Sequence, residues 1–442
     1  MSLHFQHPAS ITDVSASWPT LEELARTLTL QSGFNPTVVT LGTSLLGVAA
    51  GIVGVFAVLR KRALMCDALS HATLPGICIA FLIAGMMGWQ GRSLAVLLAG
   101  AAASAVVGIL AVHAIRGATR LTEDAAIGIV LSVFFGAGIV FLSLIQGLES
   151  GNQGGLKSFI YGQTAAMHAS DAYFMGGLAL VAALLAALFL KELALVCFND
   201  TFARVSGWPV TLIDLLTMGL IVLVTVAGLQ AVGLILVIAL LIIPPAAARL
   251  WTDNLKVMLA ASAFIGAASG YLGSCASYLL PRLPAGAVIV LVAGVIFLVS
   301  LLFAPRRGVI AGTLRRASLN LRVARDHAVR ALFERGSSTV SDLAAFGVGR
   351  RVWVAPILWN LARRGYISRS QGRWSLTERG RSDAARLERN HQLWSAYLMR
   401  HADVAASHVD WSVDAVEHVL SPQMIAELER TLASSTSSRA HE

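Results

Sequence analysis

Charged residues are scarce in this sequence. Only 13% of its 442 residues are Asp, Glu, Lys or Arg, while 56% are hydrophobic; an ordinary soluble protein carries about 25% charged residues. The apolar residues come in runs of about 20, the length that crosses a hydrocarbon core. This composition excludes an ordinary soluble globular protein and indicates a chain that is largely embedded in a membrane.

Two kinds of motif are missing. The four cysteines never show the CxxC spacing of a thiolate metal site, so we interpret them as small apolar packing residues: Cys66, Cys78, Cys197 and Cys275. No GxxxxGK[ST] phosphate-binding loop is present, so we expect the chain to bind no nucleotide and to lack ATPase activity of its own. Any energy for its work has to come from a partner.

Lysine is missing from residue 311 onward, where 19 Arg and 13 acidic residues leave a net charge of +6. The first 310 residues hold the remaining basic and acidic residues, with a net charge of +3. The chain therefore changes character near residue 305, from a membrane protein to a soluble basic module.

Nine membrane-spanning helices are predicted from the apolar runs, near residues 37–59, 64–87, 93–113, 125–146, 172–190, 210–229, 231–248, 257–280 and 286–304. With these spans the basic residues gather in alternate connections: Arg60-Lys61-Arg62, Arg116 and Arg120, Lys191 and Arg204, Arg249 and Lys256, and Arg306-Arg307. By the positive-inside rule this side is cytoplasmic, so we expect the N-terminus outside and the C-terminus inside.

One predicted span contains polar residues. Asp67 and His71 are four residues apart and share a helix face, and Ser70 adds a hydroxyl. A carboxylate and an imidazole together suit Mn²⁺, Fe²⁺ or Zn²⁺. Pro75, followed by Gly76, leaves the carbonyl of His71 without its helical hydrogen bond and predicts a helix break. Chemistry alone does not separate such a metal site from a structural Asp–His ion pair.

The stretch Asp67 to Gly76, DALSHATLPG, resembles the signature of the permeases of manganese, zinc and iron ABC importers. Further stretches resemble that family in the same order over residues 38–308: EDAAIGI from Glu123, GLQAVG from Gly228, LIIPPAAARL from Leu241 and LLFAPRRG from Leu301. Pro281 stands where the family usually has an acidic residue, which puts an outer carboxylate there in doubt.

The resemblance implies a function and a set of partners. It implies a multi-pass permease of the bacterial inner membrane that moves a divalent metal ion into the cytoplasm past Asp67 and His71. The implied partners are a separate ABC ATPase, an extracytoplasmic metal-binding protein, a second permease chain and the lipid bilayer. The sequence names neither the metal nor whether the second permease is a copy of this chain.

A short connection between two spans resembles the element of this family that docks on the ATPase. Asn199 and Asp200 supply helix caps, and Gly207 and Pro209 supply stops. We predict that Asp200, Phe202, Ala203, Arg204 and Gly207 couple transport to ATP hydrolysis; an ordinary connecting loop is the alternative. A second helix break is predicted at Pro244-Pro245, which remove the backbone bonds to the carbonyls of Leu240 and Leu241.

The basic C-terminal module reads as two helices, near 341–348 and 351–364, followed by two short strands near 365–369 and 372–377. This is the pattern of a winged helix-turn-helix. We expect no nucleic-acid partner, however, because Pro356 interrupts the second helix and Trp353 and Trp359 replace the small polar residues of a groove-reading helix.

The segment from His391 to Leu428 resembles the metal-binding domain of diphtheria-toxin-repressor-like regulators, which depend on iron or manganese. Residues that correspond to ligands in that family, or stand near them, imply a regulatory Mn²⁺ or Fe²⁺ site: His391, Asp410, Asp414, Glu417 and His418. A solvated acidic helix face is the alternative reading of this charge-rich segment.

These patterns together predict an all-α polytopic membrane protein of about nine transmembrane helices with a C-terminal cytoplasmic winged-helix and helical metal-binding domain. The expected parts are a polar leader (1–36), a transmembrane permease (37–308), a linker (309–317), a winged-helix-like domain (318–385), a metal-sensing-like region (386–432) and a disordered tail (433–442). The main reading is a metal permease that its C-terminal domain feedback-regulates. The alternative is a membrane-tethered or released metal-dependent transcriptional regulator.

Overall fold

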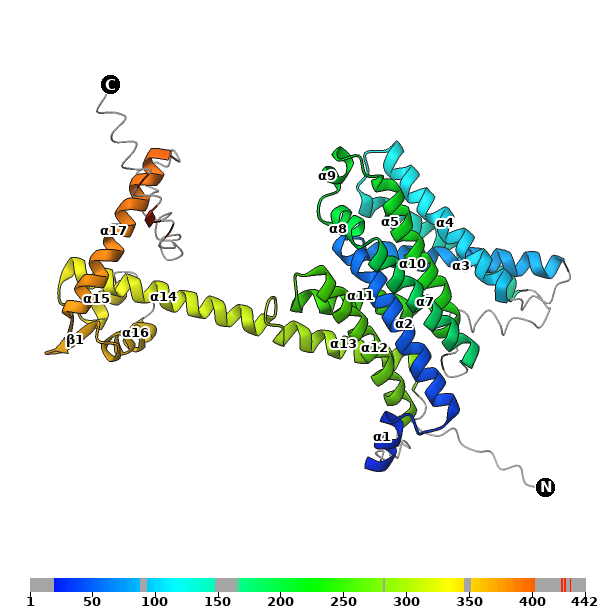
Figure 1. Cartoon of the computed structure of the whole chain (residues 1–442), viewed down its shortest axis with the longest axis horizontal. Helices are drawn as coiled ribbons and strands as arrows, with labels where there is room; N and C mark the ends of the chain where they lie inside the picture. The colour runs from blue at the N-terminus through cyan, green and yellow to red at the C-terminus, as the bar shows by residue number, and fades with distance from the viewer. Residues whose placement is uncertain are drawn as a thin grey trace. The chain divides into compact units, whose positions relative to one another are not determined.

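The computed structural model of the chain describes residues 20–87, 94–147, 164, 167–280, 283–345 and 351–401, together with 423, 425, 426 and 430. The chain divides into two compact units, Met1–Ala311 and Gly312–Glu442. Figure 1 shows both along the chain. The boundary falls where the composition changes from apolar to basic.

In the part of the chain that the structure describes, the first unit contains nine helices that are long and apolar enough to cross a membrane. They confirm the nine predicted spans, with ends that differ by a few residues: α2 Phe34–Leu59, α3 Ala63–Met86, α4 Leu94–Ala118, α5 Glu123–Gln146, α7 Ala169–Leu188, α10 Val210–Val232, α11 Leu234–Trp251, α12 Leu255–Leu279 and α13 Ala285–Phe303. The described part of the unit also contains three short helices: α1 Leu21–Leu28, α8 Leu190–Phe198 and α9 Asp200–Val205.

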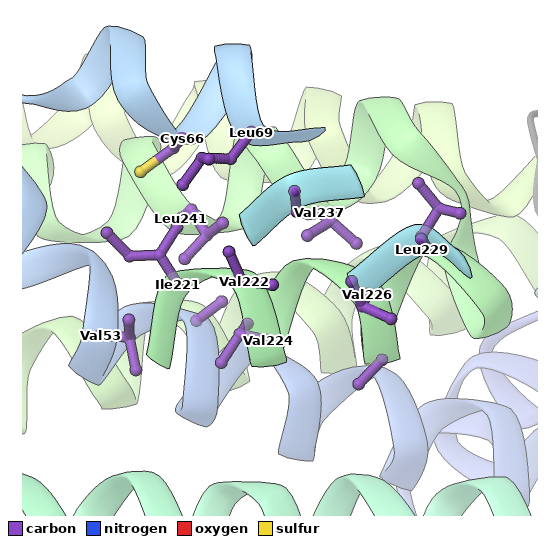
Figure 2. Close-up of a cluster of buried hydrophobic side chains, with 14 of the residues drawn as sticks. Val53, Cys66, Leu69, Ile221, Val222, Val224, Val226, Leu229, Val237 and Leu241 are labelled. Atoms are coloured by element: carbon purple, nitrogen blue, oxygen red, sulfur yellow. The ribbon is translucent and has the colours of Figure 1, made fainter. Parts of the chain in front are cut away.

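Helix α10 lies in the interior of this unit. Val222, Val224 and Val226 of α10 belong to one buried cluster with Leu69 of α3 and Leu241 of α11 (Figure 2). Helix α10 also packs directly against α2, α3 and α4. Any displacement of α10 is therefore felt by the helices on both sides of it, because close-packed interiors transmit strain.

Glycines set the distance between α2 and α12. A Cβ at Gly47 would overlap the backbone of Gly266, and a Cβ at Gly266 would overlap that of Gly47. One turn further along, Ser262 donates a hydrogen bond of 2.7 Å to the carbonyl of Gly51. Small residues thus face each other across this helix contact, as expected where lipid gives helices no hydrophobic reason to associate.

The prolines do not end their helices. Helix α3 continues through Pro75 and Gly76, and α11 continues through Pro244 and Pro245. This corrects the predicted helix breaks: a proline removes one hydrogen bond, but the flanking turns keep the helical path. Gly76 serves close packing instead, because a Cβ there would overlap the backbone of Gly100 in α4.

The second unit begins within the long helix α14, Val309–Arg335, so the predicted linker 309–317 is helical. The remaining elements are α15 Val340–Ala345, α16 Arg351–Arg363, β1 Ile367–Ser370, β2 Arg373–Leu376 and α17 Glu378–His401. The two strands pair antiparallel from Ile367↔Leu376 to Ser370↔Arg373. Gln371 and Gly372 between them both have positive φ, of 50° and 79°, as a two-residue type I′ hairpin requires.

This order of helices and hairpin is the predicted winged-helix pattern, and its core joins Leu332 of α14, Leu358 of α16 and Trp374 of β2. One detail of the prediction is wrong. Helix α16 runs on through Pro356 without interruption, so this proline does not break the second helix of the pattern.

The α2–α12 contact gives a direct test of the fold. Replacing Gly47 with Ala should lower the thermal stability of the purified chain, because the new methyl would overlap the Gly266 backbone, which cannot move aside. Gly219→Ala in α10 is the control, since a Cβ there meets nothing within 4 Å and alanine favours helix by about 1 kcal/mol. Equal melting temperatures for the two variants in detergent would contradict the role of Gly47.

Candidate metal path and coupling site

Asp67 and His71 lie one turn apart on α3 and face each other. Nε2 of His71 is 3.4 Å from Oδ1 of Asp67. Two donors that are each about 2.1 Å from a shared ion lie at about this separation. The imidazole ring packs edge-on against Phe135 of α5, with ring centroids 4.9 Å apart.

The second ring nitrogen of His71, Nδ1, is buried and has no hydrogen-bond partner within the described residues. Buried polar atoms are rarely left in this state. The ring therefore faces Asp67 with Nε2, the atom placed to share an ion, and keeps unused bonding capacity at Nδ1 in the described structure.

Ser70 and Pro75 lie on the same helix but have different surroundings. The Ser70 hydroxyl is fully buried and donates a 2.7 Å hydrogen bond to the carbonyl of Cys66, in its own helix. Next to the carbonyl of His71, which Pro75 leaves without a helical donor, the carbonyl of Ala72 accepts a 2.6 Å bond from Ser104 of α4. The structure thus aligns Asp67 with His71 and ties the Ser70 hydroxyl to the helix backbone.

Within the described ranges, no group of three or more His, Cys, Asp or Glu side chains is placed to hold a metal ion. Asp67 and His71 offer two donors, whereas the transition metals discussed above take four to six ligands. A complete site at this position needs donors besides these two side chains.

The predicted coupling element folds as the short helix α9. The Asn199 side chain caps it by accepting a 2.9 Å hydrogen bond from the backbone N–H of Phe202, and Gly207, with φ of +81°, ends the turn. Ala203 is fully buried, whereas Phe202 is 57% exposed. Arg204 and Asp200 form an exposed ion pair at 3.8 Å. Helix α9 is thus anchored on one face and presents an apolar aromatic on the other.

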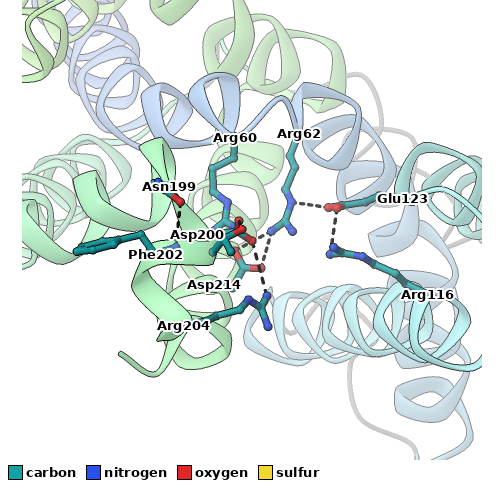
Figure 3. A network of polar contacts seen from close by, with 10 residues as sticks. Arg60, Arg62, Arg116, Glu123, Asn199, Asp200, Phe202, Arg204 and Asp214 are labelled. Carbon is teal, nitrogen blue, oxygen red and sulfur yellow. Dashed lines mark hydrogen bonds and ion pairs between the residues drawn. The ribbon is translucent and has the colours of Figure 1, made fainter. Parts of the chain in front are cut away.

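Beside α9 lies a network of buried charges that the sequence analysis missed (Figure 3). Asp214 of α10 forms ion pairs with Arg60 at 2.6 Å and with Arg62 at 2.7 Å, and both of its oxygens accept from Arg62. Arg62 also pairs with Glu123, the first residue of α5, which Arg116 of α4 contacts at 3.0 Å.

Electrostatics bind this network to α9. Burial is the largest effect on the pKa of Arg60 and lowers it, while attraction to Asp214 and, more weakly, to Asp200 of α9 raises it. The side chains of Arg60, Arg62 and Asp214 are less than 10% exposed, and breaking such a buried pair costs about 3–5 kcal/mol. A sequence signal was present, because Asp214 is an ionisable residue inside a predicted span, and such residues default to function.

The predicted C-terminal ligands lie outside what the structure describes. The backbone of His391 belongs to α17, but its side chain is not among those described, and Asp410, Asp414, Glu417 and His418 fall outside the described residues. Pro281, the departure noted in the sequence, falls outside them too. Their roles stay predictions.

Comparison with known proteins extends this evidence. Residues 36–304 match the ABC 3 transport family, and residues 377–439 match the iron dependent repressor metal binding and dimerisation domain. Both resemblances drawn from the sequence are thereby confirmed.

Individual relatives agree with the family match. The chain is 36% identical over 370 residues to the manganese transport system membrane protein MntC of Bacillus subtilis, covering 82% of this chain and 84% of the relative. It is 44% identical over 283 residues to the zinc transport system membrane protein TroC of Treponema pallidum, covering 64% and 93%. A solved structure of PsaBC from Streptococcus pneumoniae in complex with Fab superposes with a TM-score of 0.55 at 30% identity, over 66% of this chain and 99% of that one.

The family match spans more than half of the chain and includes α3, α9 and the buried charge network. The chain therefore belongs to the ABC 3 transport family and carries, at its C-terminal end, a segment that matches the metal binding and dimerisation domain of iron dependent repressors.

Proposed function

We propose that this chain is the permease of an ABC importer that moves a divalent transition metal, manganese, zinc or iron, into the cytoplasm. The Asp67–His71 pair in α3 carries the proposal. Ionisable residues inside membrane spans are costly and mark ion pathways, and a carboxylate with an imidazole is a donor set for these metals. The relatives named for manganese and zinc transport support the same cargo.

A second permease chain completes the path. One chain supplies two donors from Asp67 and His71, and two chains related by a two-fold axis supply four. The same arrangement protects the pair from lipid, because the side chains of Asp67 and His71 are 34% and 23% exposed in the single chain. A separate ABC ATPase provides the energy, and an extracytoplasmic metal-binding protein delivers the ion.

The end of the membrane unit that carries Arg60, Arg62 and α9 faces the cytoplasm in this proposal. The positive-inside rule favours that orientation, and it places the N-terminus outside. There the exposed Phe202 of α9 docks on the ATPase, because an aromatic side chain buried in a partner's pocket is a typical binding anchor. Asp200, Arg204 and the Gly207 turn hold the anchor in place.

Loss of the metal donors should stop transport. Asp67→Ala and His71→Ala should each lower uptake of Mn²⁺ or Zn²⁺ in a strain without other importers by at least about tenfold, because a lost donor leaves the ion path incomplete. Ser70→Ala is the control on the same helix and should keep most uptake, since its hydroxyl is bonded to the Cys66 carbonyl. Normal uptake by an Asp67→Ala, His71→Ala double variant would rule out the path.

Loss of the aromatic anchor should uncouple the chain from its ATPase. Phe202→Ala should weaken co-purification of the ATPase subunit and abolish transport-linked ATP hydrolysis, because truncating a buried anchor costs about 2 kcal/mol or more. Tyr173→Ala in α7 is the control: its ring is 81% exposed but lies at the other end of the spans. ATPase binding unchanged by Phe202→Ala would reduce α9 to a connecting loop.

The C-terminal unit regulates the permease in this proposal. Its match to a metal binding and dimerisation domain covers His391, Asp410, Asp414, Glu417 and His418, and these residues would hold a Mn²⁺ or Fe²⁺ ion drawn from the cytoplasm. An ion that binds the resting state more tightly than the active one slows import as the cytoplasmic metal rises. A tenfold preference corresponds to about 1.4 kcal/mol, enough for feedback without complete shutdown.

A double variant in the full-length chain tests this regulation. Glu417→Ala with His418→Ala should leave the initial rate of Mn²⁺ uptake unchanged but remove its decline as metal accumulates, because the sensing ion loses two donors. Uptake that still declines would contradict feedback through this site. Metal-dependent, sequence-specific DNA binding by the chain, lost in the same variant, would favour the regulator instead.

A further inference from the structure

The carboxylate of Asp214 connects two elements of the proposed function. One is α9, which docks on the ATPase, and the other is α3, which carries the Asp67–His71 pair. Along the chain, α9 is followed by the turn 206–209 and then by α10, which carries Asp214 in its second turn. Across the fold, Asp214 holds Arg62, the residue immediately before α3. Asp67 follows five residues later, about 7.5 Å along the helix.

The geometry of the contact makes it stiff. Nη1 of Arg62 is 2.7 Å from each of the two Asp214 oxygens, while its Nε contacts Glu123 at the start of α5. A planar guanidinium held on two edges has a fixed orientation, which a lysine ammonium does not reproduce. The beginning of α3 is thus clamped between α10 on one side and α5 on the other.

Attraction between opposite charges also connects Arg60 to both α10 and α9. Arg60 lies in the same connection as Arg62 and pairs with Asp214 at 2.6 Å, and it is also attracted by Asp200 in α9. A shift of α9 therefore changes the field on Arg60 and pulls on α10 through the short turn. Arg60 and Asp214 are buried, so water screens the interaction between these two groups poorly.

We propose that Asp214 is a positioning residue for transport: through Arg62 it transmits movement of the coupling helix α9 to α3 and so to the Asp67–His71 pair. The proposal rests on the proposed function and deepens it. It assigns the Asp214–Arg62 contact a role in linking ATP hydrolysis to ion movement, beyond its contribution to folding.

The same chain supplies a matched control. Asp253, between α11 and α12, is also held by two arginines, with distances of 2.9 Å to Arg306 and 2.6 Å to Arg307. Hydrogen bonding to Arg306 lowers its pKa. Its side chain is 47% exposed, however, and its arginines follow α13. Removing this carboxylate disturbs a pair of similar chemistry that touches neither α9 nor α3.

The experiment measures how many ATP molecules are hydrolysed for each imported ion. The full complex of permease, ATPase and binding protein is reconstituted in vesicles, and imported Mn²⁺, with Zn²⁺ in parallel, is counted against ATP hydrolysed. Asp214→Asn should raise the ATP hydrolysed per imported ion by at least about tenfold, while Asp214→Glu restores part of the coupling and Asp253→Asn keeps the normal ratio. Arg62→Lys keeps the charge but has only one nitrogen in place of the Nη1 and Nε that contact Asp214 and Glu123, and it should raise the ratio as well.

Each outcome has a clear consequence. A proportional fall of uptake and hydrolysis, or an unchanged ratio, in Asp214→Asn and Arg62→Lys would overturn the proposal, because a purely structural contact lowers both activities together. If Asp214→Asn does not assemble, the ratio in Arg62→Lys decides. If the unmodified complex imports neither metal, and no Fe²⁺ in a third assay, the proposed function itself fails, which is distinct from import with an unchanged ratio.

Discussion

The hydrocarbon interior of a membrane offers no hydrogen bonds to a peptide backbone, and much of this structure follows from that fact. Each span is a helix because only a helix satisfies its own backbone groups. At Pro245 two helices pack closely: a Cβ at Gly54 of α2 would overlap the carbonyl of Leu241, the group that Pro245 leaves without a donor. The backbones of α2 and α12 likewise touch at Gly47 and Gly266. The prolines are therefore accommodated inside continuous helices.

The same low polarity gives the few charged groups their importance. Asp214, Arg60 and Arg62 are buried at one end of the spans, where each ion is stabilised by its partners rather than by water. Asp67 and His71, deeper along α3, are partly exposed and only two in number. The charges of the first set pair with one another, whereas the second set is partly exposed and supplies only two donors for a metal ion. This difference suits a mechanical link at one point of the chain and a transient ion site at the other.

The second unit is stabilised in a different way. Its core joins the buried side chains of Leu332, Leu358 and Trp374, and apolar burial stabilises it. A polar surface surrounds that core, with arginines such as Arg363 and Arg379 stacked on aromatic rings.

Hydrophobic run length and loop charge determined the nine spans from the sequence alone, because membrane thickness imposes both. The helical spacing of Asp67 and His71 likewise fixed their pairing, and the Asn199 cap and the Gly207 stop defined α9. Tertiary structure decided the rest. It showed that α3, α11 and α16 continue through their prolines, since neighbouring turns maintain the helix. It also joined Arg62 to Asp214, which lie 152 positions apart. Local pattern carries no information about such a contact, because only the packing of α10 against α3 brings the two charges together.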